Sequence, residues 1–495
     1  MPNAVELMMI RILASCLQAA LVAVQRVREG CSGRAGPPRD PPRRHVGWEA
    51  LRSGLFLGLA LLAAGCARDG ALAPATPVVV TPIPVVLAST PAPAPTAVAV
   101  SATGAPSPTA VPPTPTQAAE ATPLPVALRR QIFHEVWSTI DEKYLYPDFR
   151  GLDWAATREE FAPLVESAAD DAAFFALMVE MVGRLGDEHS RFLPPSDAQR
   201  QDALTSGREE QVGIGVIVLP LRDALLIQHV FPDSPAERAG LQPRDRIVAI
   251  DGALYSQGDI QGPEGSQVRL TVVRPGEASR DLVITRRRVE GRIGPTTLRL
   301  PGNIGYLGVT TLWVNDMDVQ IREALARLTG PAPLRGLIID LRSNPGGWRS
   351  VMTGMLGHFA RGEVGRFTSR AGDTPLEIGP VPPDLRGLPL VVLVDEGTAS
   401  YAEVIAAVLQ QHAGAVVVGA PTAGNTETIY AYDLSGGARL WVAQEGFELA
   451  NGAALEGAGV QPDIMTLDDW TRFSTADDPG IVLALGLLNR GAGGK

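Results

Sequence analysis

Lysine is nearly absent from this sequence of 495 residues. The chain has 43 Lys and Arg side chains together, yet its lysines are Lys143 and Lys495 alone. A reaction that depends on a catalytic lysine must therefore use one of these two positions. Cysteine is also scarce, because Cys16, Cys31 and Cys66 all lie in the first 66 residues. This distribution excludes a disulfide framework or a cysteine-based metal site in the rest of the chain.

Several classes of ligand lack their sequence signals. The formal charge is -11 and no stripe of basic residues occurs, which argues against nucleic acid as a partner. No HExxH motif, paired cysteines or clustered His and Asp spacing is present, so we predict no metal and no cofactor. The glycine-rich segment at 419–424, GAPTAG, lacks the lysine of a phosphate-binding loop, which argues against nucleotide binding.

The first 66 residues have the features of an export segment. An apolar run at 54–64 follows several arginines and ends in AAGC, which resembles a bacterial lipoprotein signal with lipidation at Cys66. The alternative is an uncleaved membrane anchor, and both interpretations place the rest of the chain outside the cytoplasm, on the outer face of the membrane or in the cell envelope. Another apolar stretch precedes this one, so translation starting near Val46 is a further hypothesis.

The composition then changes twice. Residues 67–126 are rich in Pro, Ala and Thr without a periodic apolar face, which predicts a disordered, partly polyproline linker. Residues 127–199 are predicted to form a helical domain, because Ile132, Val136 and Ile140 recur every four residues beside Phe133 and Trp137.

Residues 200–288 alternate short β-rich runs with turn signals and resemble a PDZ domain. In this resemblance, Gly213, Ile214, Gly215 and Val216 form the loop whose backbone N–H groups receive the terminal carboxylate of a peptide. The peptide would then add as a strand to the edge of the sheet. A PDZ domain that only packs and gates is the alternative.

Residues 289–495 alternate strand-like and helix-like stretches and end in a predicted helix. Strands such as LIIDL and VVLV are almost entirely apolar, as in a sheet that helices cover on both faces. This predicts an α/β core with ligands beyond the carboxyl ends of the strands. Ser400 stands where such a strand joins a helix, a position that suits a nucleophile. The pattern Ser400-x-x-Glu403 is equally a helix capping box.

Four motifs occur in a fixed order: DLRSNPGG at 340–347, DEGTASYAE at 395–403, GAPTAG at 419–424 and GAGVQPDI at 457–464. With the PDZ-like segment, they resemble the carboxyl-terminal processing peptidases, also called tail-specific proteases. The resemblance implies a crotonase-like α/β protease core with an N-terminal helical segment and an inserted PDZ domain. It also implies polypeptide substrates, recognised through their C-termini.

The same resemblance assigns site residues. Ser400 is the expected nucleophile, and the backbone N–H groups near Gly346 and Gly347, together with that of Tyr401, are expected to form the oxyanion hole. In the Ser–Lys members of the family, the base is the lysine just after the GxxTxG segment. This sequence has Asn425 there, so the Ser–Lys dyad is absent.

A histidine branch of the superfamily, typified by the tricorn protease core, offers another base. Its L-x-D-x-H-[ST] segment resembles residues 185–190, LGDEHS, which implies His189 as the general base and Glu456 as the acid that supports it. Tricorn-type sites place a hydroxyl residue before the histidine, where this chain has Glu188. The link from Glu456 to His189 is therefore direct, passes through Ser190, or is replaced by Glu188. His358 is a reserve candidate for the base.

The leading hypothesis is an exported, lipid-tethered serine endopeptidase that cleaves unfolded or C-terminally exposed proteins through a Ser400 acyl-enzyme. The competing hypothesis is an inactive relative that binds peptides through its PDZ domain and core groove. It draws support from Asn425 and Glu188.

Overall fold

The computed structural model describes residues 123–187 and 189–490. The predicted export segment with Cys66, nearly all of the linker and Glu188 lie outside the described residues. Within the described ranges, no helix is both long enough and apolar enough to cross a membrane.

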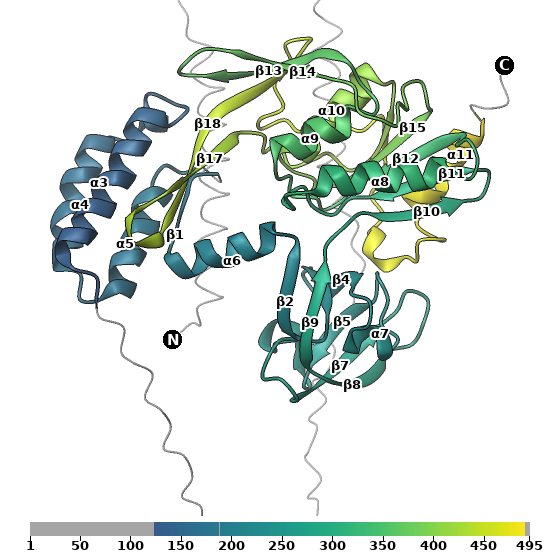
Figure 1. Cartoon of the computed structure of the whole chain (residues 1–495), viewed down its shortest axis with the longest axis horizontal. Helices are drawn as coiled ribbons and strands as arrows, with labels where there is room; N and C mark the ends of the chain where they lie inside the picture. The colour runs from purple at the N-terminus through teal and green to yellow at the C-terminus, as the bar shows by residue number, and fades with distance from the viewer. Residues whose placement is uncertain (1–122, 188, 491–495) are drawn as a thin grey trace, which may run out of the picture. The chain divides into compact units, whose positions relative to one another are not determined.

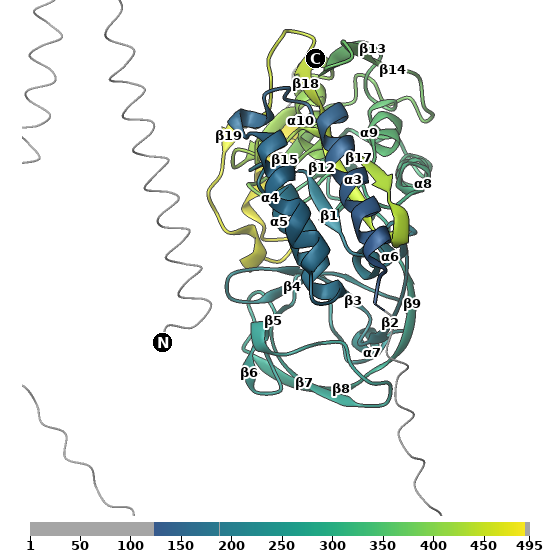
Figure 2. The same cartoon turned by 90° about the vertical axis from the view of Figure 1, so that its left-hand side faces the viewer.

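The described chain begins with three helices. They pack against a strand that comes from near the C-terminal end of the chain. The apolar stripe of Ile132, Val136 and Ile140 is fully buried. It shares one hydrophobic cluster with Leu440 and Val442, so this region is not an independent helical unit. Figure 2 shows the three helices in front of the short strand β1. The elements are α3 (Val126–Lys143), α4 (Trp154–Ser167), α5 (Asp171–Gly183), β1 (Arg191–Leu193) and α6 (Pro195–Thr205).

The PDZ region is a compact β structure with its own core (Figure 1). Its main sheet has the order β3-β4-β5-β7-β8, which leaves β3 at one edge, and β6 pairs with β5. A separate ribbon of β2 and β9 leads into and out of the domain. The elements are β2 (Arg208–Gly213), β3 (Val216–Pro220), β4 (Leu225–Val230), α7 (Pro235–Arg238), β5 (Arg246–Ile250), β6 (Ala253–Leu254), β7 (Gln267–Val273), β8 (Arg280–Thr285) and β9 (Arg287–Arg292).

The C-terminal α/β region, called the core below, contains a six-stranded sheet of order β10-β11-β12-β15-β16-β19, parallel except for the β10–β11 pair. Alternate residues of its strands face opposite clusters: Leu337 packs with α8, α9 and α10, whereas Ile338 packs with α11. Helices therefore cover both faces, as predicted for an α/β core. The elements are β10 (Thr296–Leu300), β11 (Ile304–Gly308), α8 (Met317–Thr329), β12 (Gly336–Asp340), α9 (Arg349–Leu356), β15 (Leu390–Val394), α10 (Tyr401–His412), β16 (Val416–Gly419), β19 (Ile464–Met465) and α11 (Pro479–Arg490).

A second sheet joins the helical region to the core. Its path is β1-β18-β13-β14, with β17 also paired to β18. Arg191 of β1 lies opposite Trp441 of β18. This pairing brings the segment that precedes β1 to the core, although the two are far apart in sequence. The elements are β13 (Gly362–Ser369), β14 (Thr374–Ile378), β17 (Thr428–Asp433) and β18 (Arg439–Leu449); short 3-10 turns occur at Phe149–Gly151, Tyr255–Gln257, Ser435–Gly437 and Trp470–Arg472.

Candidate active site

Ser400 lies at the N-terminus of α10, just beyond the carboxyl end of β15. Its backbone has a φ of 57°, a left-handed conformation that is strained for a residue with a side chain. The Ser400 N–H donates to the Glu403 carboxylate at 2.9 Å and to the Asn425 carbonyl at 2.8 Å. These bonds hold the serine in its turn, at the edge where ligands of α/β sheets bind.

Glu403 is fully buried and connects this turn to the segment that carries Asn425. Besides the Ser400 N–H, its carboxylate accepts hydrogen bonds from the Thr422 hydroxyl and from the N–H groups of Gly424 and Asn425, at 2.5, 2.7 and 2.9 Å. The predicted capping box is therefore present, and the same carboxylate also fixes the 422–425 loop against Ser400.

The predicted oxyanion-hole residues surround Ser400. A Cβ on Gly346 would lie 2.6 Å from the Ser400 Cβ, so any side chain there would collide with the serine. The Gly346 N–H already donates to Asn344 at 2.9 Å. Gly347, by contrast, has no hydrogen-bond acceptor for its N–H among the described residues, and the Tyr401 N–H is the first of its helix and lacks an intrahelical acceptor. Gly347 and Tyr401 are therefore the available donors.

Ser400, Gly347, Tyr401, Asn425 and His189 all line one cavity of about 490 Å³. Lys143 ends α3, where its ammonium lies 3.9 Å from Glu142. The chain thus brings a histidine, and no described lysine, to the cavity of the serine.

His189 is positioned by a tight turn before β1. The Asp187 carboxylate accepts the N–H groups of His189 and Ser190 at 3.0 and 2.5 Å. The Ser190 hydroxyl accepts the N–H of Ala443, which attaches the turn to β18. The Ser190 hydroxyl is therefore hydrogen-bonded to the backbone of β18. His358, the reserve candidate, is buried after α9, with its Nδ1 2.9 Å from the Pro383 carbonyl.

Two carboxylates, and not one, face the imidazole of His189. Its Nε2 lies 3.8 Å from Glu456 Oε1 and 3.7 Å from Glu427 Oε2. Glu427 is 2% exposed, and its other oxygen accepts the Tyr146 hydroxyl at 2.5 Å. The sequence analysis missed Glu427. No motif in the sequence includes Glu427.

The three groups shift one another's protonation. Burial works to lower the pKa of His189, but Glu456, Glu427 and Asp187 outweigh it and raise that pKa above its ordinary value. Burial raises the pKa of Glu427, against the opposing effects of Tyr146 and His189. Burial also works to raise the pKa of Glu456, yet His189 and Thr426 lower it overall. Glu456 is therefore the carboxylate better suited to remain charged beside the imidazole.

Aromatic side chains form the apolar wall of the same cavity. Trp313, Trp348 and Trp441 line it, with Trp313 ring centroids 4.9 Å from Trp348 and 5.6 Å from Trp441. The Arg191 guanidinium lies 5.8 Å from the Trp441 ring. Apolar and aromatic side chains beside a few polar groups are typical of ligand-binding pockets.

A second cavity, of about 1020 Å³, lies between the PDZ edge strand and the core. Ile217 and Leu219 of β3 line it together with Asp395 and Trp470, and Pro345 lines both cavities. The PDZ loop predicted to bind a terminal carboxylate, 213–216, lies between β2 and β3. The strand edge to which a peptide would add therefore faces a cavity that shares the lining residue Pro345 with the Ser400 cavity.

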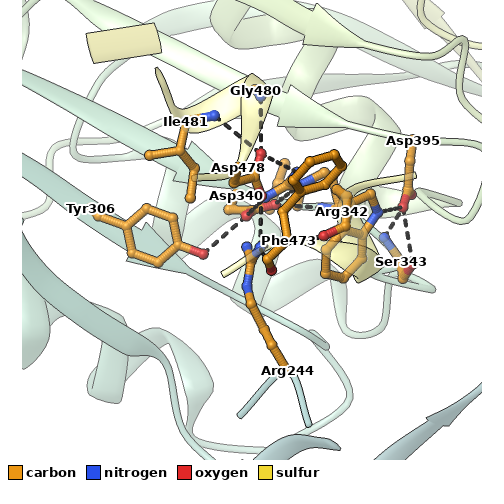
Figure 3. Close-up of polar contacts among 12 residues, drawn as sticks. Arg244, Tyr306, Asp340, Arg342, Ser343, Asp395, Phe473, Asp478, Gly480 and Ile481 are labelled. Atoms are coloured by element: carbon orange, nitrogen blue, oxygen red, sulfur yellow. Dashed lines mark hydrogen bonds and ion pairs between the residues drawn. The ribbon is translucent and has the colours of Figure 1, made fainter. Parts of the chain in front are cut away.

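The PDZ domain is joined to the core by buried charges (Figure 3). Arg244 donates to Asp478 at 2.8 Å and lies 5.3 Å from the Trp470 ring. Asp478 also pairs with Arg342 at 2.9 Å, and Arg342 pairs with Asp340. Arg342 and Asp340 belong to the DLRSNPGG motif, so one buried network connects that motif to the PDZ domain.

Known protein families match successive parts of the chain. The model of peptidase family S41 matches residues 303–466, that of the tricorn protease C1 domain matches 125–183, and that of a PDZ domain matches 227–274. These matches, with the observed α/β core, confirm the predicted fold class.

Curated relatives cover most of the chain. It is 31% identical over 368 residues to carboxyl-terminal-processing peptidase 2, chloroplastic, of Arabidopsis thaliana, covering 67% of this chain and 68% of that one. It is 27% identical over 399 residues to the carboxyl-terminal-processing protease of Synechocystis sp., covering 75% and 90%, and 28% identical over 341 residues to that of Picosynechococcus sp., covering 66% and 81%. Because one of these relatives is 31% identical and is covered over 68% of its length, and the S41 model matches the core, the chain belongs to the carboxyl-terminal-processing serine peptidases of family S41, whose substrates are polypeptides.

Proposed function

We propose that this peptidase hydrolyses peptide bonds of unfolded or C-terminally exposed proteins through an acyl-enzyme on Ser400, with His189 as the general base. The observation that carries the proposal is that one cavity holds Ser400, His189 and the free N–H groups of Gly347 and Tyr401, while Asn425 occupies the family's lysine position.

The surroundings of His189 support different roles for its two ring nitrogens. Nε2 faces the carboxylates of Glu456 and Glu427, so the neutral ring keeps its proton on Nε2. Nδ1 is then the nitrogen that accepts a proton. The supporting acid orients the ring and stabilises its charged form, as the acid of other serine-protease triads does.

The reaction follows from these positions. The Ser400 hydroxyl oxygen attacks the substrate carbonyl carbon while its proton passes to His189 Nδ1. The N–H groups of Gly347 and Tyr401 stabilise the resulting oxyanion, and the α10 N-terminus adds its positive dipole end. His189 returns the proton to the leaving amine as the C–N bond breaks. Water then attacks the ester with His189 again as base, and Ser400 is released.

The PDZ domain binds the C-terminal end of the substrate. A C-terminal segment adds to β3 as a further antiparallel strand, with its carboxylate at the Gly213–Val216 loop. The preceding residues occupy the cavity beside Trp470 and pass Pro345 into the Ser400 cavity. This route favours chains without stable structure near the C-terminus.

The enzyme acts outside the cytoplasm as a lipid-anchored protein. This part of the proposal rests on the sequence alone: the apolar run at 54–64, the AAGC segment ending at Cys66 and the linker that follows. The test is metabolic labelling with a palmitate analogue. Labelling of the wild type that is lost in Cys66→Ser supports the anchor, and labelling that persists in Cys66→Ser contradicts it.

A second candidate function is a catalytically inactive peptide-binding protein, which the loss of the family's lysine at Asn425 favours. One experiment separates the two. Cleavage of an unfolded protein is compared for the wild type, Ser400→Ala and His189→Ala, and fluorophosphonate labelling of Ser400 is measured in parallel. The peptidase proposal requires cleavage by the wild type that falls by about 1,000-fold or more in both variants. Equal rates in all three proteins would refute it, and peptide binding without cleavage by the wild type would establish the inactive binder.

A further inference from the structure

Three ligand atoms from distant parts of the chain surround one point beside the nucleophile cavity. His189 Nε2 lies 3.7 Å from Glu427 Oε2 and 3.8 Å from Glu456 Oε1. The ligand atoms of the three residues all lie within 4.8 Å of one another. These separations exceed the range of about 2.7–3.2 Å for a direct hydrogen bond. The three atoms therefore leave a gap among them.

The two carboxylates are held so that one oxygen of each faces this gap. Glu456 Oε2 accepts the N–H groups of Thr426 and Glu427 at 2.6 and 3.2 Å, which leaves Oε1 toward His189. Glu427 Oε1 accepts the Tyr146 hydroxyl, which leaves Oε2 toward His189. Hydrogen bonds to the other oxygen of a ligating carboxylate orient the ligands of metal sites in the same way.

Glu427 Oε2 supplies an independent indication. It is buried and accepts no hydrogen bond from any described group. A buried carboxylate oxygen without a hydrogen-bond partner is destabilising, because it has lost its hydration without compensation. The structure thus keeps an acceptor without a partner 3.7 Å from an imidazole nitrogen, with a second carboxylate on the same side.

We propose that His189, Glu427 and Glu456 bind one divalent cation of the zinc type, and that this cation inhibits the peptidase. One imidazole and two carboxylates are a ligand set that zinc accepts, whereas calcium and magnesium prefer sites of oxygen ligands alone. Tetrahedral zinc with ligands at about 2.0–2.2 Å separates its donors by about 3.4 Å. The two histidine–carboxylate pairs would therefore have to close by only about 0.4 Å.

The position of the site gives the cation a way in and an open ligand position. His189 and Glu427 line the cavity of about 490 Å³ that contains Ser400, whereas Glu456 lies outside that lining with a side chain that is 35% exposed. An ion can therefore enter through the substrate cavity, and water from that cavity completes its coordination.

Inhibition follows from the tautomer of His189 and rests on the proposed function. A cation on Nε2 takes the electron pair of that nitrogen and leaves the ring proton on Nδ1. Nδ1 is the nitrogen that must accept the Ser400 proton, so the base is lost while the cation remains. The cation also binds Glu456, which would otherwise stabilise the charged ring.

Binding is measured first, apart from activity. Zinc and cobalt(II) are titrated into full-length Ser400→Ala, which keeps the ligands and cannot form an acyl-enzyme. Calorimetry gives the stoichiometry, and the cobalt spectrum separates this site from the thiols of Cys16, Cys31 and Cys66. Thiolate ligands give a strong near-ultraviolet charge-transfer band that nitrogen and oxygen ligands lack.

The same titration is repeated with the double variant Ser400→Ala/Glu427→Gln. The matched control is Ser400→Ala/Glu377→Gln, since Glu377 is exposed. We expect Ser400→Ala to bind one equivalent of the metal without a thiolate band. The affinity for this equivalent should fall by at least about tenfold in Glu427→Gln and stay unchanged in Glu377→Gln. Circular dichroism checks the fold, and Glu456→Gln replaces Glu427→Gln if the latter does not fold. Absence of this equivalent, or equal affinity in the ligand variant and the control, would overturn the site.

Activity decides the second half of the proposal. Zinc should abolish cleavage by the wild type, and a chelator should restore it. Zinc that binds through Glu427 without slowing an active enzyme would overturn the inhibition. If the wild type cleaves nothing even with a chelator, the proposed function fails, and the binding titration still decides whether the site exists.

Discussion

Replacing Asp478 by Asn should destabilise the protein strongly, because this carboxylate is the centre of the network between the PDZ domain and the core (Figure 3). Asp478 is fully buried and pairs with Arg244 of the PDZ domain and Arg342 of the core at 2.8 and 2.9 Å. It also accepts the Gly480 N–H at 2.9 Å at the start of α11. Asn keeps the shape and one acceptor oxygen but removes the charge shared by two arginines.

The size of the loss in free energy of unfolding depends on which partners the two arginines keep. Arg342 is buried and retains Asp340, whereas Arg244 retains only the Phe473 carbonyl at 3.1 Å and a more distant carbonyl of Trp470. Removing one partner of a buried ion pair costs about 3–5 kcal/mol. Because Asp340 still neutralises Arg342, we expect the loss in free energy of unfolding near the lower end, about 3 kcal/mol.

Urea unfolding of Asp478→Asn in the Ser400→Ala background, which prevents self-cleavage, measures this loss. Asp477→Asn is the matched control, since that exposed neighbour bonds to Ser474 and should change stability by less than about 0.5 kcal/mol. Separate probes in the PDZ domain and the core should show the two transitions moving apart, because the network joins them. A loss below about 1 kcal/mol, or an equal loss in the control, would refute the reasoning.

Three other predictions concern the active site. Gly346→Ala should lower kcat by about 100-fold or more, because its Cβ would lie 2.6 Å from the Ser400 Cβ; Gly387→Ala, at a similar φ with open space around it, should keep wild-type kcat. With a chelator present, kcat/KM should rise with pH through a pKa above the ordinary value of histidine, since the raised pKa of His189 keeps the base protonated below it; a pKa at or below about 6.5 would contradict this. Asn425→Lys should fail to rescue His189→Ala, and a recovery of more than about tenfold in kcat/KM would show that a lysine there can act as base.

The fold was largely predictable because its signals are local. Apolar strands such as β12 and β15 alternate with amphipathic helices, and PDZ-like turns mark the inserted domain. The pairing of β1 with β18 was not predictable, since three residues of β1 give no periodic signal and the partner lies far along the chain. That pairing makes the helical region part of the core, and it places the turn with His189 beside Ser400.

The site was predictable where a motif carries it and not where tertiary packing does. Ser400 and Gly347 belong to motifs whose backbone geometry is part of the signal. Glu427 belongs to no motif, and its importance appears only when β17 places it between His189 and Tyr146. The sequence lacks metal-binding spacing, but such spacing cannot reveal ligands that come from three separate segments, as His189, Glu427 and Glu456 do.

The absence of a lysine from the described lining of the Ser400 cavity and the presence of the second carboxylate beside His189 fit one electrostatic arrangement. A lysine base must lose its charge before it can accept a proton, so it needs burial without anions nearby. Glu427 and Glu456 create the opposite environment, which would hold an ammonium group charged. Histidine tolerates those anions because its unperturbed pKa is about 6.5, roughly four units below that of lysine, and an upward shift still leaves a usable base. The same anions that suit histidine also attract a divalent cation. A site with a histidine base and two carboxylates therefore avoids the need to neutralise a lysine, but it becomes sensitive to inhibition by metal.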